Sequence, residues 1–168
     1  MIEERYELAL DRIRLMQTED TVGEPYRDYF KKMAEFVLML DELRTELLDG
    51  RYQKLELDEL RKWNRRLYQD VLPGQYEKSY ANPDYACKML GKESGQILGM
   101  LYAELRGAVV YVFEGKTEYL AILYELLIEV YNQFEEEPDP KAVRDTFYWY
   151  ASDYSDVFLA DRVAEQVD

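Results

Sequence analysis

Apolar residues recur along the chain at steps of three and four, which places them on one side of an α-helix. The first segment shows the pattern in its simplest form, with one narrow apolar row made of Ile2, Tyr6, Ala9, Ile13 and Met16. Short polar breaks with glycine or proline separate similar rows further on. The predicted helices cover residues 2–16, 26–49, 57–69, 83–113, 118–135 and 140–167. The sequence therefore predicts an all-α fold, a single helical bundle of about six helices.

The region from 57 to 85 carries weaker signals. In its helical part, Trp63 flanks a short row made of Leu57, Leu60, Asn64 and Leu67. The rest is irregular and rich in turn residues, but it holds the aromatic residues Tyr76, Tyr80 and Tyr85. We expect this irregular part to pack on the surface of the core.

The predicted helix 83–113 contains a row of small residues at an interval of four: Gly91, Gly95, Gly99, Ala103 and Gly107. Such a row forms one ridge along a helix. Glycine inside a helix costs about 1 kcal/mol relative to alanine, so another interaction must offset the loss. We expect close packing of a second helix against this ridge, with the glycine-ridged helix as the central element of the bundle.

Arg106 lies near the glycine ridge and has two interpretations. Its guanidinium could bind an anion, or it could form an ion pair with a carboxylate on a neighbouring helix. The ion pair is the favoured interpretation, because structural ion pairs also occupy such positions.

Acidic residues form a stripe on the predicted helix 118–135 and just beyond it: Glu118, Glu125, Glu129 and Glu136. Carboxylates on adjacent turns could hold a metal ion. They also lie opposite the apolar face, where charged residues are expected in any case. A solvated helix face is the favoured interpretation.

The stretch YWYASDYSDVF, residues 148–158, combines aromatic and acidic residues. A helical projection places an apolar row on the core side: Val143, Phe147, Tyr150, Tyr154 and Val157. The outer group consists of Trp149, Asp153 and Asp156, which we regard as a candidate interface together with Arg106. Contact with a partner and internal packing remain equally open for this group. A catalytic acid–base pair is disfavoured, since neither aspartate has a basic or nucleophilic companion in the sequence.

Composition indicates a globular domain, with 48% hydrophobic and 33% charged residues. The sixteen tyrosines predict that tyrosine hydroxyls form many hydrogen bonds within the core. The net charge of −14 disfavours nucleic acid and anionic membranes as partners. One basic cluster, made of Arg61, Lys62, Arg65 and Arg66, reads as a solvated helix face.

Cysteine and histidine usage narrows the possible chemistry. The single cysteine, Cys87, cannot form an internal disulfide, and the first residues lack a secretory-signal layout, so we expect a cytoplasmic protein. The longest uncharged apolar run, GAVVYVF, is too short to span a bilayer. The chain has no histidine, which excludes Ser-His-Asp and Cys-His catalysis and the usual histidine-containing zinc sites.

Several segments resemble a known family: EPYRDYF, SYANPDYA, LYAELRG, VFEGKTEYL, YNQFEEE and SDYSDVFLADRVAEQVD. They are similar to the amino-terminal region of clostridial leucyl aminopeptidases and aminopeptidase T-like metallopeptidases. The resemblance implies that residues 1–168 form the amino-terminal helical domain of a longer protein. It places the histidine and carboxylate metal ligands in a later catalytic part, so no catalytic, cofactor or metal residue transfers to this chain. A divalent metal is expected only in that later part.

Three functions remain open from the sequence. The first is a non-catalytic module that docks onto a catalytic domain, controls access to it or forms a homo-oligomer. The second is an enzyme that uses carboxylates and tyrosines. The third is a free-standing acidic adaptor. The small-residue ridge, the Trp149 group and the missing histidine favour the first.

Overall fold

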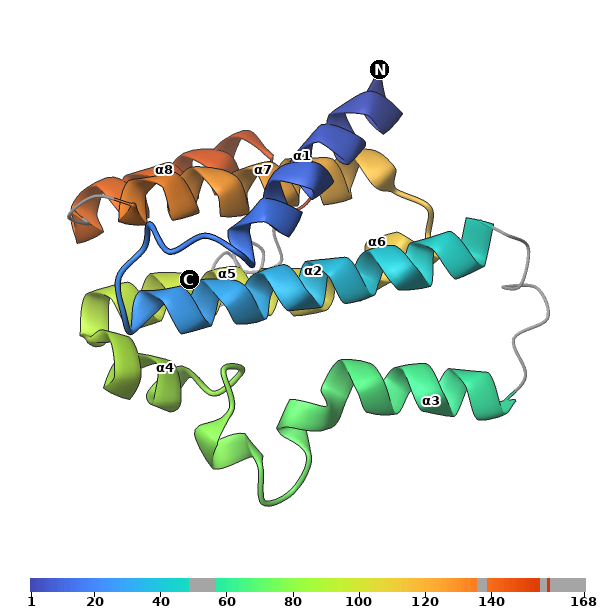
Figure 1. Ribbon diagram of the computed structural model, residues 1–168, viewed down its shortest axis with the longest axis horizontal. Coiled ribbons are helices and arrows are strands. Elements are labelled where there is room, and N and C mark those ends of the chain that lie inside the picture. The colour runs from blue at the N-terminus through green and yellow to red at the C-terminus, as the bar shows by residue number, and fades with distance from the viewer. Residues whose placement is uncertain (49–56, 136–138, 155–156, 158–168) are drawn as a thin grey trace.

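The computed structural model describes residues 1–48, 57–135, 139–154 and 157, and every regular element in these ranges is helical. Figure 1 shows the helices in three tiers. The upper tier consists of α1 (Ile2–Met16), α7 (Thr117–Phe134) and α8 (Pro140–Asp153). The middle tier consists of α2 (Tyr26–Leu48), α5 (Lys92–Gly107) and α6 (Val109–Phe113). The lower tier holds α3 (Leu57–Tyr68) and α4 (Pro83–Leu90), joined by short 3-10 turns at Gln69–Val71 and Tyr76–Lys78.

The predicted all-α fold is confirmed, and the apolar rows of the long helices face the core. In α1 the buried residues are Tyr6, Ala9, Leu10, Ile13 and Met16, while Ile2 is exposed. The interior is crowded with rings: Phe30 of α2 meets Tyr131 and Phe134 of α7 at centroid distances of 5.2 and 5.3 Å. The longest amphipathic rows therefore predict both the helices and their buried faces.

The predicted continuous helix 83–113 is wrong, because the chain leaves the helical conformation at Gly91. At Ala108, between α5 and α6, the backbone stays in the right-handed helical region. Gly91 has φ +89°, a value that favours glycine, and it lets α4 fold back against α5. An alanine Cβ built at Gly95 would lie 2.5 Å from Cα of Cys87. The close packing expected along the whole ridge occurs at this residue.

The other members of the ridge have different roles. Gly99 makes only an ordinary contact, since a Cβ there would lie 3.8 Å from Cβ of Ala86. Ala103 is exposed, and Gly107 is the last residue of α5. The packing of α5 against α2, α4, α6, α7 and α8 supports its expected central position.

Two further predicted elements need correction. In α3 the buried residues are Trp63 and Leu67, whereas Leu57 and Leu60 are exposed, because the indole of Trp63 turns toward α2 and donates to Glu46 at 2.7 Å. Helix α8, predicted to run from 140 to 167, ends at Asp153, and most of the predicted remainder lies outside the described residues. Beyond it the hydroxyl of Tyr111 donates to the carbonyl of Val157 at 2.7 Å, which holds that residue against the core.

Polar side chains form hydrogen bonds within the core, as the tyrosine content predicts. The hydroxyl of Tyr6 donates to Asp41 at 2.7 Å, and that of Tyr29 donates to the carbonyl of Tyr80 at 2.7 Å. The second bond ties the irregular segment after α3 to α2, so the expected packing of that segment on the core is confirmed. The buried guanidinium of Arg44 lies over the ring of Tyr6 and donates to Glu3 at 2.7 Å.

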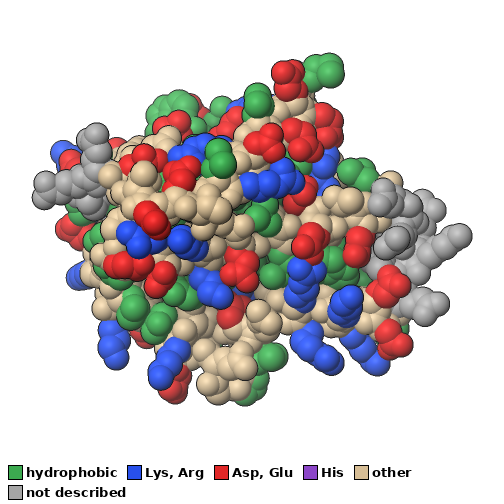
Figure 2. All heavy atoms as spheres, viewed as in Figure 1, with side chains coloured by type: hydrophobic (Ala, Val, Ile, Leu, Met, Phe, Trp, Pro, Cys, Tyr) green, Lys and Arg blue, Asp and Glu red, His purple; other side chains and the backbone are tan. Residues whose placement is uncertain are grey.

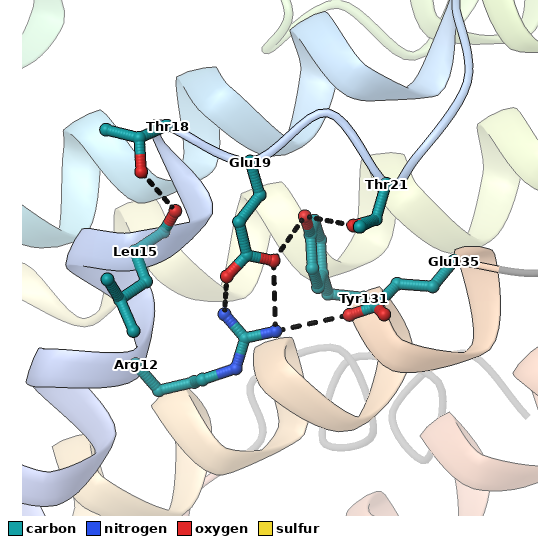
Figure 3. A network of polar contacts seen from close by, with 7 residues as sticks. All are labelled: Arg12, Leu15, Thr18, Glu19, Thr21, Tyr131 and Glu135. Carbon is teal, nitrogen blue, oxygen red and sulfur yellow. Dashed lines mark hydrogen bonds and ion pairs between the residues drawn. The ribbon is translucent and has the colours of Figure 1, made fainter.

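A polar network fixes the loop between α1 and α2 onto α7 (Figure 3). Arg12 donates to Glu19 at 2.7 Å and to Glu135 at 3.2 Å. The hydroxyl of Tyr131 also bonds Glu19 and lies 3.2 Å from the hydroxyl of Thr21. These side chains form their hydrogen bonds and ion pairs with one another, so we interpret the cluster as structural.

By length and composition alone, Lys92–Phe113 is apolar enough to cross a membrane. More than half of this segment is buried among the other helices, and the core helix of a soluble protein passes the same test. Its apolar character is accounted for by its place in the core.

We expect Gly95→Ala and Gly99→Ala to have opposite effects on stability. At Gly95 the added methyl meets the backbone of Cys87, so the free energy of unfolding should fall by about 2 kcal/mol. At Gly99 the methyl has room, and the better helix propensity of alanine should add up to about 1 kcal/mol. Denaturant unfolding followed by circular dichroism measures both. Equal effects would contradict the close contact between α4 and α5.

We also expect the fold to fail in alkali. Burial is the main cause that raises the pKa of Tyr6, Tyr29, Tyr102 and Tyr124 above the usual value. Below about pH 10 both the folded and the unfolded chain keep these protons, so the stabilisation is complete. Above it only the unfolded chain releases them, and stability should fall by about 1.4 kcal/mol per pH unit for each tyrosine. Tyrosinate absorbance of the buried rings should then rise together with loss of the helical dichroism signal. Their ionisation without helix loss would contradict this.

Candidate functional site

An open groove of about 690 Å³ runs along α5, which has α4 beneath it and α8 above it in Figure 1. Helix α4 contributes Pro83 and Cys87, and α8 contributes Arg144 and Tyr148. Helix α5 supplies the remaining lining: Lys92, Glu93, Gly95, Gln96, Ile97, Gly99, Met100 and Ala103. The groove is larger than the hollows of about 240 Å³ beside Asp70 and about 480 Å³ on α3, so we regard it as the candidate site.

Small residues keep the floor of the groove open. Gly99 and Ala103 lie one turn apart on α5, and neither has a side chain beyond Cβ. The row of small residues thus serves two purposes. At Gly95 it admits α4, and at the next two positions it leaves space.

Local signals position the two helices beside the floor. The side chain of Asn82 caps α4 by accepting from the backbone N–H of Asp84 at 3.0 Å. Asp139 caps α8 in the same way, accepting from the N–H of Lys141 at 3.1 Å. The buried residues of α8 are Val143, Phe147 and Ala151, which leaves Tyr148 half exposed at the groove.

The charges of the groove differ from those of the chain as a whole. Lys92 and Arg144 line it beside the single acidic residue Glu93. Within the described part of the chain neither cation forms an ion pair. The groove therefore combines an apolar floor with two positive charges that no described residue neutralises, in a protein of net charge −14.

Arg106 lies in an ion pair, the interpretation favoured from the sequence. Its Nη1 donates to both carboxylate oxygens of Asp70, at 2.8 and 3.1 Å. The guanidinium also lies within 6 Å of three rings, those of Phe36, Tyr68 and Tyr102. Arg106 thus joins α5 to α2 and to the turn after α3.

Asp70 gains further donors from neighbouring hydroxyls. Those of Tyr102 and Ser79 bond its Oδ2 at 3.1 and 3.3 Å. Burial raises the pKa of Tyr102, and the adjacent Asp70 carboxylate raises it further, while Arg106 acts in the opposite direction. A phenol held protonated in this way acts as a donor to the carboxylate, which suits a structural role.

A smaller pocket of about 240 Å³ adjoins this ion pair. Most of its charged residues form ion pairs within the chain. Lys32 lies 3.6 Å from Glu35, and Asp70 pairs with Arg106. The pocket has less room and fewer uncommitted groups than the groove, which remains the better candidate.

The predicted acidic stripe on α7 does not act as a unit. Glu118 and Glu129 are exposed, whereas Glu125 accepts from Nε of Arg5 on α1 at 2.7 Å. Glu136 lies outside the described residues. No group of three or more potential metal ligands comes together in the described ranges.

The Trp149 group lies on the outer side of α8, as the projection predicts. Trp149 is 55% exposed and its ring meets that of Tyr150 edge-on at 4.9 Å, while Asp153 is exposed as well. Asp156 lies outside the described residues. Arg106 belongs to the separate cluster around Asp70, so the structure does not unite the four candidate interface residues.

The sequence pattern does not single out Tyr148, Arg144 or Met100, which line the groove. One signal was available, because Lys141, Arg144 and Tyr148 step by three and four along one side of α8. That this side meets the open stretch of α5 follows only from the packing of the two helices.

We expect Asp70→Asn to lower the free energy of unfolding by about 2 kcal/mol. The change leaves the Arg106 side chain, only 12% exposed, without its negative partner. The matched control is Asp11→Asn, because Asp11 pairs with Arg14 on the open surface and should change stability by about 0.5 kcal/mol or less. Equal losses in chemical denaturation would show that the Asp70 pair is no more important than a surface pair.

Comparison with known proteins leaves the family open: no family model matches the chain, and no curated protein or solved structure does. The resemblance to aminopeptidase T-like metallopeptidases therefore stays a prediction from the sequence.

Proposed function

We propose that this chain is a non-catalytic helical interaction domain that docks a partner helix in the groove along α5. The partner in this proposal is the catalytic part of a metal-dependent leucyl aminopeptidase-like protein, of which the chain forms the amino-terminal arm. The open floor at Gly99 and Ala103, beside the half-exposed ring of Tyr148, is the observation that carries the proposal.

The dimensions and lining of the groove suit a helix. From Lys92 to Ala103, α5 extends about 17 Å, which corresponds to three helical turns. A guest helix could approach closely at Gly99, which is half-buried, has no side chain of its own and would have only Cβ of Ala86, at 3.8 Å, near an added Cβ. Met100 and Tyr148 would supply adaptable and aromatic contact area, the kinds of residue that are enriched at interfaces. Recognition would then follow the helix-in-groove mode.

The division between docking and catalysis rests on the sequence. The chain contains no histidine, and the family that it resembles carries its metal ligands in a later part. An acidic adaptor that uses the same groove for another protein is the alternative.

We expect the separately produced downstream part of the protein to bind residues 1–168, and Tyr148→Ala to weaken that binding about tenfold. The matched control is Trp149→Ala, the neighbouring exposed aromatic residue, which does not line the groove and should change binding less than about threefold. Isothermal titration calorimetry measures both variants. A larger loss for Trp149→Ala would place the interface on the outer side of α8.

The same preparations test the non-catalytic role. Residues 1–168 alone should not cleave leucine amides with added divalent metal, and chelator-sensitive cleavage would overturn the proposal. Reading the gene past codon 168 identifies the downstream part. A stop codon directly after Asp168 would favour the adaptor.

A further inference from the structure

The outer face of α3 gathers positive charge on an acidic protein. Arg61, Lys62, Arg65 and Arg66 line a shallow hollow of about 480 Å³, with Asp58 as its one acidic residue. Figure 2 shows Lys and Arg side chains clustered at the lower right, the position of α3 in Figure 1. The lining thus has four cations and one anion, a balance of +3, whereas the whole chain has a net charge of −14.

Only part of this charge is neutralised within the protein. Arg66 lies over the Trp63 ring and pairs with Glu42 of α2, and Arg61 lies 4.0 Å from Asp58. Lys62 and Arg65 form no ion pair with any residue of the described ranges.

The cations also repel one another. Two like-charged pairs are one turn apart, Arg61 with Arg65 and Lys62 with Arg66. An anionic partner would relieve this repulsion as well as neutralise the free charges.

Exposed leucines lie next to the cationic face. Leu57 and Leu60, in the first turn of α3, are 61% and 41% exposed, because only Trp63 and Leu67 are buried against the body. A surface that offers both apolar area and cations suits a partner that carries leucine-like and carboxylate side chains together.

The size of the face argues for a short partner segment. Helix α3 has 12 residues and extends about 18 Å. A long polyanion such as nucleic acid, or an anionic membrane, would also meet the acidic surface around it, where the net charge repels it. A short acidic segment of a protein can lie on α3 alone.

We propose that the outer face of α3 is a docking surface for an acidic, amphipathic segment of a partner protein. The inference is independent of the groove along α5 and of the proposed link to a peptidase. It depends on charge complementarity between carboxylates of the segment and the cations Lys62 and Arg65, which no described residue neutralises.

The probe is a fluorescein-labelled synthetic helix of about 14 residues with glutamate and leucine at amphipathic spacing. Fluorescence anisotropy with residues 1–168 should show binding that weakens at least about fivefold between about 50 and 200 mM salt. The variant Lys62→Glu/Arg65→Glu should weaken binding about tenfold or more, since both side chains are exposed and form no ion pair with a described residue.

The matched control is Lys88→Glu/Lys141→Glu, which changes the net charge equally at exposed positions on α4 and α8. It should leave the affinity within about twofold of the unmodified chain. Equal weakening by both double variants would reduce the effect to net charge and overturn the proposal, as would no binding at the lower salt.

Three further measurements test the class of partner. A single-stranded oligonucleotide of the same total charge should bind more weakly than the peptide, and vesicles with anionic lipid should not retain the chain. Tighter binding to either, lost in Lys62→Glu/Arg65→Glu, would overturn the assignment to a protein segment. Sedimentation should show no self-association that depends on Lys62 and Arg65. Such self-association would assign the face to a second copy of this chain instead.

Discussion

The close approach of Gly95 to the backbone of Cys87 is the contact on which the candidate groove depends. A Cβ at this residue would lie 2.5 Å from the neighbouring Cα, so only glycine lets α4 lie so near α5. The bend at Gly91, with φ +89°, brings α4 back to that position. Helix α4 then supplies Pro83 and Cys87 to the groove, whose floor is the continuation of the same glycine row. One helix face therefore serves for internal packing at one end and for an open surface at the other.

The core is held by specific polar pairs as well as by apolar contact. Arg44 and Arg106 are both largely buried, and each has a carboxylate in front of its guanidinium and an aromatic ring beside it. Tyrosine hydroxyls extend these pairs, as where Tyr102 donates to Asp70. A buried polar group that loses its partner destabilises the fold. Loss of one pair should therefore lower the stability of this core more than loss of one apolar contact would.

The two proposed surfaces are local exceptions to the charge of the chain. The groove has an apolar floor with the cations Lys92 and Arg144, and the face of α3 has four cations beside two exposed leucines. A net charge of −14 discourages non-specific association elsewhere, since most protein and nucleic acid surfaces would meet like charge. Binding confined to the groove and the face of α3 would be selective.

The sequence by itself determined the long helices and their buried sides, because an apolar row at helical spacing identifies both without knowledge of any neighbour. It also placed Trp149 on the outer side of α8. It did not determine the break at Gly91, since glycine at an interval of four fits a continuous helix as well as a bent one. Only the tertiary structure decided that Trp63, not Leu57 or Leu60, is buried, because that depends on where α2 lies. The groove was likewise decided by tertiary structure, because its lining comes from three helices whose relative positions no local pattern encodes.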